Sequence, residues 1–140
     1  MRIEIDAELG DDQFGFRKSR GTREAMLALR LIVDGRLKKG QDTYAFVDIE
    51  KAFDNVKWDK MFDILKKIGI KFKERQVILN LYKGQKATLR IEGEKGEANI
   101  EKGVRQGCSI SPVLFNLYIK WAIKEIKEKF EAGELYMESE

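Results

Sequence analysis

The sequence predicts a mixed α+β fold in one domain, and three observations lead to that expectation. Apolar residues recur at helical spacing in several segments, one short run is β-rich and almost wholly apolar, and two later runs alternate around glycines. A chain of 140 residues with 43% hydrophobic residues is long enough to bury a core as a single globular domain. The expected order is helix, strand, helix, helix, hairpin and helix, with a short additional helix at the N-terminus.

The first third of the chain is expected to be helix, loop and helix. Residues 2–9 are compatible with a short helix, and residues 12–20 form a loop around two phenylalanines. Thr22 is placed to cap a helix that runs to about residue 39 and stops at Gly40. The apolar stripe of this helix comprises Ala25, Met26, Leu29, Ile32, Val33 and Leu37.

A buried strand and two helices follow. Residues 43–49 are almost wholly apolar, which predicts a central strand buried on both faces. Asn55 is the expected cap of a helix over residues 56–68, which ends at Gly69. A further helix is expected over residues 73–83.

A hairpin and a long helix complete the chain. Residues 86–91 alternate cleanly and residues 98–102 less so, with two glycines between them, so we expect a hairpin with a short loop. Ser111 and Pro112 form the cap and the first position of a helix that runs to about residue 130. Its inward stripe is expected to comprise Phe115, Tyr118, Ile119, Ala122, Ile126 and Phe130.

Composition removes several classes of chemistry. The chain has no histidine and a single cysteine, which excludes an internal disulfide, a zinc site built from His and Cys, and nucleophiles that depend on histidine. We expect that cysteine, Cys108, to be a small buried packing residue. No apolar run approaches the roughly 20 residues that cross a bilayer, so no membrane partner is expected.

Charge divides the chain into three segments. Residues 1–12 are an acidic lead-in and residues 131–140 an acidic tail, and together they hold nine of the 24 acidic residues and one of the 27 basic ones. Residues 13–130, which we take as the domain, therefore carry a net charge of +11, and this charge suits a polyanionic ligand. Lysines that only keep helix faces solvated would give the same balance.

Three polar segments carry candidate chemistry, each with a plainer alternative. Asp48 ends the apolar run, where an open sheet presents catalytic groups and a carboxylate can bind magnesium, or where it serves as a cap or salt bridge. The loop of residues 103–109 offers Arg105, Gln106 and backbone amides to a phosphate, or is a simple turn. Residues 15–20 carry three cations that suit phosphate, or form a solvated loop.

Taken together and in this order, three segments resemble the reverse transcriptases of non-LTR (LINE-like) retrotransposons. Residues 13–25 (QFGFRKSRGTREA) resemble the fingers motif, residues 44–54 (YAFVDIEKAFD) motif A, and residues 103–119 (GVRQGCSISPVLFNLYI) motif B. The resemblance implies a partial fingers and palm of the right-hand polymerase fold, with a small antiparallel sheet packed against helices. It implies an RNA-directed DNA polymerase that uses Mg²⁺, deoxynucleoside triphosphates, an RNA template and a DNA primer.

The same resemblance implies roles for individual residues in nucleotide binding. Arg17 would contact the incoming triphosphate. Phe53 falls at the steric-gate position, where an aromatic ring crowds a ribose 2′-OH. Gln106 and Gly107 would line the nucleotide pocket beside the sugar. These roles suit the residue types, because Arg forks onto phosphate, Gln offers both a donor and an acceptor, and Gly admits close approach.

For catalysis, the resemblance implies a metal site that this sequence only begins. Asp48 would be the catalytic aspartate that binds the first metal, with the Ile49 carbonyl sharing in it. The further metal-binding aspartates of the family lie in a later motif C, and no aspartate follows Asp63 here. We therefore expect a fragment that is inactive alone and binds Mg²⁺ weakly.

Other readings and partners stay open at this stage. The chain could instead be a non-catalytic basic module that binds RNA or DNA, or the non-functional product of a decayed retroelement. A palm strand without its neighbours would expose an edge and an apolar face, which predicts self-association through that palm edge. The compartment is not determined beyond intracellular, and the nucleus is what the family's use of chromosomal targets implies.

Overall fold

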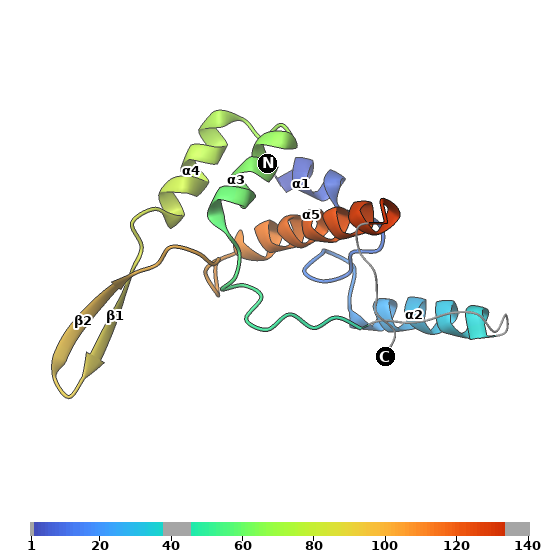
Figure 1. Cartoon of the computed structure of the whole chain (residues 1–140), viewed down its shortest axis with the longest axis horizontal. Helices are drawn as coiled ribbons and strands as arrows, with labels where there is room; N and C mark the ends of the chain where they lie inside the picture. Colours follow the sequence, from blue (N-terminus) through green and yellow to red (C-terminus); the bar gives the residue numbers. More distant parts are fainter. Residues whose placement is uncertain (1, 38–45, 134–140) are drawn as a thin grey trace.

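The computed structural model describes residues 2–37 and 46–133, and it combines helices with one hairpin (Figure 1). The elements are α1 Arg2–Glu8, α2 Thr22–Leu37, α3 Trp58–Lys67, α4 Phe72–Tyr82, β1 Lys86–Ile91, β2 Glu94–Asn99 and α5 Ser111–Glu131. β1 and β2 pair antiparallel in a two-stranded sheet. This content agrees with the mixed α and β fold predicted from the sequence.

The core lies where α1, α3 and α4 gather on one side of α5, above it in Figure 1. α3 packs against α4 and α5, and α1 packs against α5. In α3 the buried residues Met61, Ile64 and Leu65 follow helical spacing, so a single apolar face enters the core. The core residues are Ile5, Val56, Met61, Ile64, Leu65, Ile70, Ile78, Tyr82, Val104, Leu114 and Leu117.

The hairpin and α2 extend away from this core in opposite directions (Figure 1). No described helix or strand packs against α2. The stripe that we expected to face inward is therefore largely exposed, with Met26 71% and Ile32 55% accessible to solvent. The helix itself is confirmed, but its predicted burial is wrong because no described element covers that face. Residues 38–40, where the helix was expected to end, lie outside the described residues.

The predicted central strand is not present in the part of residues 43–49 that the structure describes. Residues 46–49 are extended but form no strand, and Phe46 and Val47 are 80% and 85% exposed. A strand is defined by its partner, and the sheet of the described residues contains only β1 and β2. The prediction is therefore wrong for residues 46–49, and residues 43–45 lie outside the described residues.

Asn55 does not cap α3. The helix begins at Trp58, with Lys57 in extended conformation as its N-cap and no side-chain cap bond. The Asn55 carboxamide is used elsewhere: its Nδ2 donates to the carbonyl of Glu50 (3.2 Å), and its Oδ1 accepts from Lys102 Nζ (2.9 Å). The expected helix over 56–68 is thus shorter, because its proposed cap closes the preceding turn.

Two other predicted caps, Ser111 and Thr22, are the first residues of their helices rather than the residues that precede them. Ser111 opens α5, but its Oγ lies 3.1 Å from the Tyr82 hydroxyl, and the N-cap position is Ile110. At α2 the amide of Gly21 donates to Glu24 Oε2 (3.0 Å), so the glutamate satisfies the backbone that precedes the helix. Sequence spacing located both helix starts correctly, whereas the side chain that stabilises each start depends on its neighbours.

The hairpin is confirmed with a tighter turn than expected. β1 ends at Ile91, which pairs with Glu94, so only Glu92 and Gly93 form the loop. Both have positive φ, 50° and 91°, as a two-residue turn of the I′ type requires. The second strand therefore starts at Glu94 rather than at Ala98, and Gly96 lies within it.

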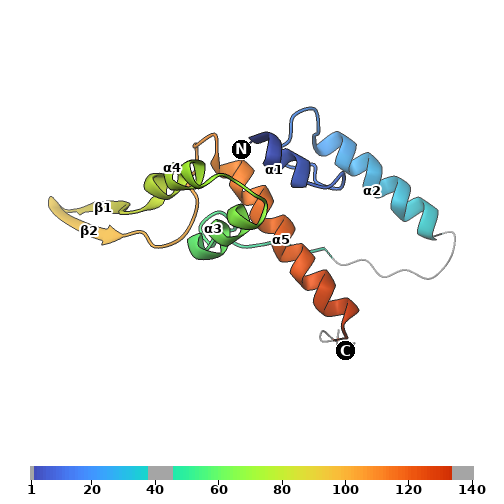
Figure 2. The same cartoon turned by 90° about the horizontal axis from the view of Figure 1, so that it is seen from above.

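The N-terminal half of α5 is buried and its C-terminal half is not. Leu114 and Leu117 are fully buried, whereas Ile126 and Phe130 are 58% and 62% exposed. Figure 2 shows α5 continuing past α3, which explains why its predicted stripe is covered only in part. Among the described residues no helix has the length and apolarity needed to cross a bilayer. Residues 134–140 of the acidic tail lie outside the described residues.

Candidate functional site

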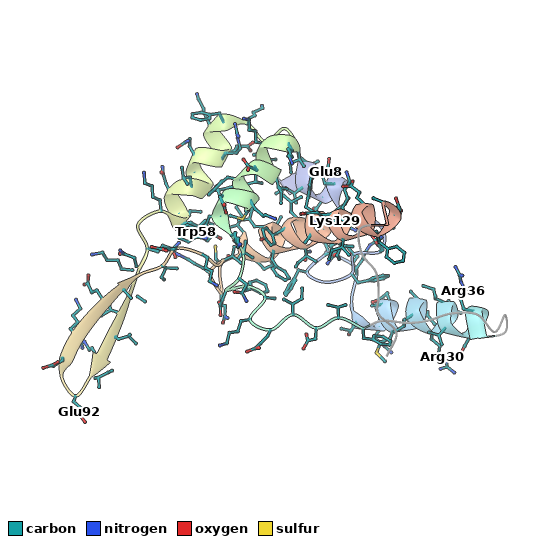
Figure 3. The ribbon with its side chains drawn as sticks, in the orientation of Figure 1. Glu8, Arg30, Arg36, Trp58, Glu92 and Lys129 are labelled. Atoms are coloured by element: carbon teal, nitrogen blue, oxygen red, sulfur yellow. The ribbon has the colours of Figure 1, made fainter. Side chains whose placement is uncertain are left out.

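Two segments that are far apart in the sequence are joined by their backbones beside the start of α5. The amide of Gly103 donates to the carbonyl of Val56 (2.8 Å), and the amide of Val104 donates to the carbonyl of Phe53 (2.9 Å). Trp58, labelled in Figure 3, donates from Nε1 to the carbonyl of Gly103 (2.7 Å). The three bonds hold the end of the motif A segment against the beginning of the motif B segment.

Gly103 makes this junction possible. It has a positive φ of 94°, and a Cβ at this position would lie 3.1 Å from both the Cα and the carbonyl oxygen of Asp54. Those atoms belong to backbone and have little room to yield. Glycine is therefore required for both its conformation and its lack of a side chain.

Three phenylalanine rings meet at the same place, one from each of the three motifs. Phe53 stacks on Phe115 with ring centroids 4.4 Å apart and an interplanar angle of 14°. Phe16 meets Phe53 edge-on, at 5.8 Å and 80°. Phe16 itself has a positive φ of 55°, which is unusual for an aromatic residue. The rings thus tie the fingers loop, the motif A turn and α5 into one cluster.

A small open pocket of about 230 Å³ lies beside these rings. It is lined by Phe16, Phe53, Arg105, Gln106, Gly107 and Pro112. Phe53, Gln106 and Gly107 are residues that the sequence resemblance assigned to nucleotide binding, and the structure brings all three to one pocket. Sequence reasoning missed Phe16 and Pro112 as lining residues, although both lie within the quoted motifs.

The Arg17 side chain does not line this pocket. Its Nη1 donates to the carbonyls of Gly10 (2.7 Å) and Gln13 (3.4 Å), which closes the loop that carries it. In this arrangement Arg17 stabilises the fingers loop. Its predicted contact with a triphosphate stays a prediction.

Asp48 and Ile49 lie in the extended stretch before the motif A turn and do not line the pocket either. Asp48 is exposed and Ile49 is 48% exposed. Within residues 2–37 and 46–133, no group of three or more acidic, cysteine or histidine side chains is arranged to hold a metal ion. The metal-binding role of Asp48 and Ile49 therefore stays a prediction, since the described residues do not supply the several oxygen ligands that magnesium takes.

Two larger hollows contain none of the predicted site residues. One of about 400 Å³ lies between α3 and α5 beside Trp121, and one of about 590 Å³ lies on the hairpin beside Leu89. Volume alone would favour them. We consider the smaller pocket the candidate site because residues 105–107 bring a guanidinium, an amide and a glycine backbone beside aromatic rings from two other segments.

Cys108 follows the pocket residues and is half-buried rather than buried, which corrects the expectation of a buried packing residue. The backbone amide of Ile110 lowers the pKa of its thiol, and burial opposes this effect. The thiol therefore interacts with the first turn of α5 rather than with the core.

Comparison of this sequence with known proteins identifies its family. A family profile described as "Reverse transcriptase (RNA-dependent DNA polymerase)" matches residues 2–138, which is nearly the whole chain. The chain belongs to the reverse transcriptase family. No solved structure gives a significant match to it.

The reverse transcriptase chain is also similar to curated proteins of insect retrotransposable elements. It is 30% identical over 99 residues to the "Retrovirus-related Pol polyprotein from type-1 retrotransposable element R2" of Nasonia vitripennis, covering 70% of this chain and 10% of that protein. It is 30% identical over 119 residues to the R2 protein of Popillia japonica (82% and 17%). It is 27% identical over 122 residues to the R2DM protein of Drosophila melanogaster (86% and 12%).

These relatives confirm the lineage predicted from the motifs. The chain spans between 10% and 17% of the length of the three relatives, so it corresponds to a segment of their reverse transcriptase region. Dependence on a metal is general in this family.

Proposed function

We propose that this chain contributes the deoxynucleotide-binding corner of an RNA-directed DNA polymerase of the retrotransposon type. The observation that carries the proposal is the pocket beside α5. Residues from motif A and motif B converge there, and Phe53, Gln106 and Gly107 share its wall.

The chemistry of the pocket suits a nucleoside triphosphate. Arg105 supplies a guanidinium at its edge, and Gln106 supplies a carboxamide that both donates and accepts. Gly107 has a positive φ of 79°, and a Cβ at this position would meet nothing within 4 Å, so a ligand can approach its backbone closely. The Phe53 ring is held in place by its stack on Phe115. A side chain that discriminates between sugars by steric exclusion must be held in this way.

In the proposed function, the Asp48 carboxylate and the carbonyl of Ile49 are the groups of this chain that would bind magnesium. The exposed carboxylate is accessible to an ion, but the described residues do not complete a coordination shell around it. An RNA template, a DNA primer and the right-hand arrangement of fingers and palm are proposed for the longer protein to which such a segment belongs.

The test is direct nucleotide binding by the purified chain. A fluorescent deoxynucleoside triphosphate and its ribonucleotide counterpart are titrated separately, and we expect the deoxynucleotide to bind more tightly. Phe53→Val removes the ring, so the affinity ratio should shift toward the ribonucleotide by about tenfold, the size of one lost packing contact. Phe130→Val, at an exposed position near the end of α5, is the matched control and should leave the ratio unchanged.

Absence of nucleotide binding by the unmodified chain would contradict the proposal. An equal effect of the Phe53 and Phe130 substitutions would contradict the assignment of the pocket, because only Phe53 lines it.

A basic RNA- or DNA-binding module is the second candidate, favoured by the net charge of +11 on residues 13–130. Lys86, Arg90 and Lys95 share one face of the hairpin, where Glu97 pairs with two of them. Binding through phosphate contacts should weaken with salt, with a log–log slope of about −0.9 per neutralised phosphate for duplex DNA. A salt-independent affinity would remove this candidate.

A further inference from the structure

Asn116 is a polar side chain buried inside the candidate site region. It lies in the second turn of α5 and is only 2% exposed. A buried carboxamide is costly unless its polar atoms have partners. Both partners come from the fingers loop: Nδ2 donates to the carbonyl of Gly15 (2.7 Å), and Oδ1 accepts from Gln13 Nε2 (3.2 Å).

The two bonds define which side chains can occupy position 116. The donor end and the acceptor end of the carboxamide have different partners, so its orientation is fixed. Leucine has a similar shape but neither polar atom. Aspartate keeps the acceptor for Gln13 but places a negative oxygen against the carbonyl of Gly15. Asparagine satisfies both partners and leaves no orphaned group.

The loop held in this way carries Phe16, whose ring meets Phe53 at the pocket wall. The positive φ of Phe16 is a strained conformation for a bulky residue, and such a conformation persists only where the surroundings hold it. Neighbouring residues of α5 therefore control both rings: Phe115 stacks on Phe53, and Asn116 holds the loop that presents Phe16.

We propose that Asn116 is a positioning residue that fixes the loop of residues 13–17 on α5 and thereby places the Phe16 ring against Phe53. Phe16 and Phe53 then form two sides of one corner, and their relative placement sets how much room the pocket leaves beside the sugar. This consequence for sugar selectivity rests on the proposed function. The positioning of the loop does not.

The first test measures the loop without any nucleotide. Trypsin cleaves after Arg17 and Lys18, so the rate of cleavage there reports how firmly the loop is held. We expect Asn116→Leu to raise this rate by about tenfold, because a lost buried hydrogen bond is worth about that factor. Asn116→Asp should raise it at least as much, because a buried carboxylate oxygen would face the carbonyl of Gly15. The matched control is Asn80→Leu, at an exposed position on α4.

Gln13→Ala provides a second route if Asn116→Leu reduces folding. Gln13 lies in a partly exposed loop outside the core, and the substitution removes only the 3.2 Å side-chain bond. Cleavage should rise again, and Gln13→Ala combined with Asn116→Asp should give less than the product of the two single effects. A rate equal to that of Asn80→Leu in both routes would overturn the proposal.

The second test measures sugar selectivity with the fluorescent deoxy- and ribonucleotides. Asn116→Asp and Gln13→Ala should lower the preference for the deoxynucleotide by at least about threefold, as expected for a loosened hydrogen bond. Ile78→Val removes one methylene group from the core and should lower stability without changing the preference. An unchanged preference in the loop variants would overturn the link between Asn116 and the pocket. If the unmodified chain binds neither nucleotide, the proposed function fails, and the cleavage rates alone decide whether Asn116 positions the loop.

Discussion

At Gly103 the backbones of two motifs approach so closely that a Cβ would lie 3.1 Å from the Cα and the carbonyl oxygen of Asp54. The neighbouring amides of Gly103 and Val104 donate into the turn formed by residues 53–56. This contact joins the loop that leads into the candidate pocket to the segment that precedes α3. The consequence of adding a single methyl group there can be measured.

Gly103→Ala should destabilise the fold by about 2 kcal/mol or more, because it combines a disfavoured positive φ with a clash against backbone. Urea denaturation followed by circular dichroism measures the change. Gly96→Ala is the matched control, since a Cβ there meets nothing within 4 Å, and it should be neutral or slightly stabilising. Equal midpoints for the two variants would show that the junction does not have the stated geometry.

The residues of the pocket differ in how far the sequence could predict them. Phe53, Gln106 and Gly107 follow from the order of the motifs, and they share a pocket. Phe16 could not be predicted, because its contact with Phe53 depends on a positive φ that no propensity favours. The metal role of Asp48 remains a prediction.

Between elements, the link from α4 to α5 depends on a buried tyrosine. Tyr82 is 1% exposed, packs near Trp58, and places its hydroxyl 3.1 Å from Ser111 Oγ. Burial raises the pKa of Tyr82 above its ordinary value, with the bond to Ser111 acting in the opposite direction. The folded state therefore binds the phenolic proton more tightly than the unfolded state does.

This shift predicts a loss of stability in alkali. The contribution of Tyr82 is fully present below about pH 10, the value for an exposed tyrosine, and is lost as the pH rises further toward the folded-state pKa. Tyr82→Phe should lose about 1 kcal/mol at neutral pH with the Ser111 bond, yet decline less steeply above pH 10. Thermal melts between pH 7 and pH 11 measure both effects. A parallel decline of the two proteins would contradict the role of Tyr82.

Helices were predicted more reliably than strands for a physical reason. The hydrogen bonds of a helix are internal, so apolar spacing and stop signals located α2, α4 and α5 to within a few residues. A strand depends on a partner, and residues 46–49 have none among the described residues. The cap predictions for Asn55 and Ser111 were wrong for a related reason. Both side chains bond to residues distant in the sequence, and local sequence does not reveal those partners.

On the scale of the whole molecule, large apolar side chains remain exposed at several places. They include Met26, Leu27, Leu31 and Ile32 on α2, Phe46 and Val47 in the extended stretch, and Phe130 near the end of α5. Exposed apolar groups of this size favour association. The predicted palm-edge strand is not formed by residues 46–49, but their apolar side chains are exposed, so we retain the prediction that copies of this chain associate and place the contact at this stretch.

Val47→Lys should weaken that association by about tenfold, because it replaces one apolar side chain in the contact by a charge. Sedimentation velocity over a range of protein concentrations gives the dissociation constants. Phe130→Lys introduces the same charge at a distant exposed position and should have little effect. If both substitutions weaken association equally, the contact is not at this stretch. A chain that is monomeric at every concentration would also contradict the prediction.

Gly103 and Val104, which directly precede the pocket residues 105–107, are bonded to Val56, Phe53 and Trp58, and to no strand among the described residues. The candidate pocket and Asp48 thus lie on separate segments: the pocket is bonded to the start of α3, and Asp48 lies in an exposed stretch. A partner segment that pairs with residues 46–49 would position Asp48 without changing the residues that line the pocket. Under the proposed function, the shape of the nucleotide pocket would therefore be set before a partner segment positions Asp48.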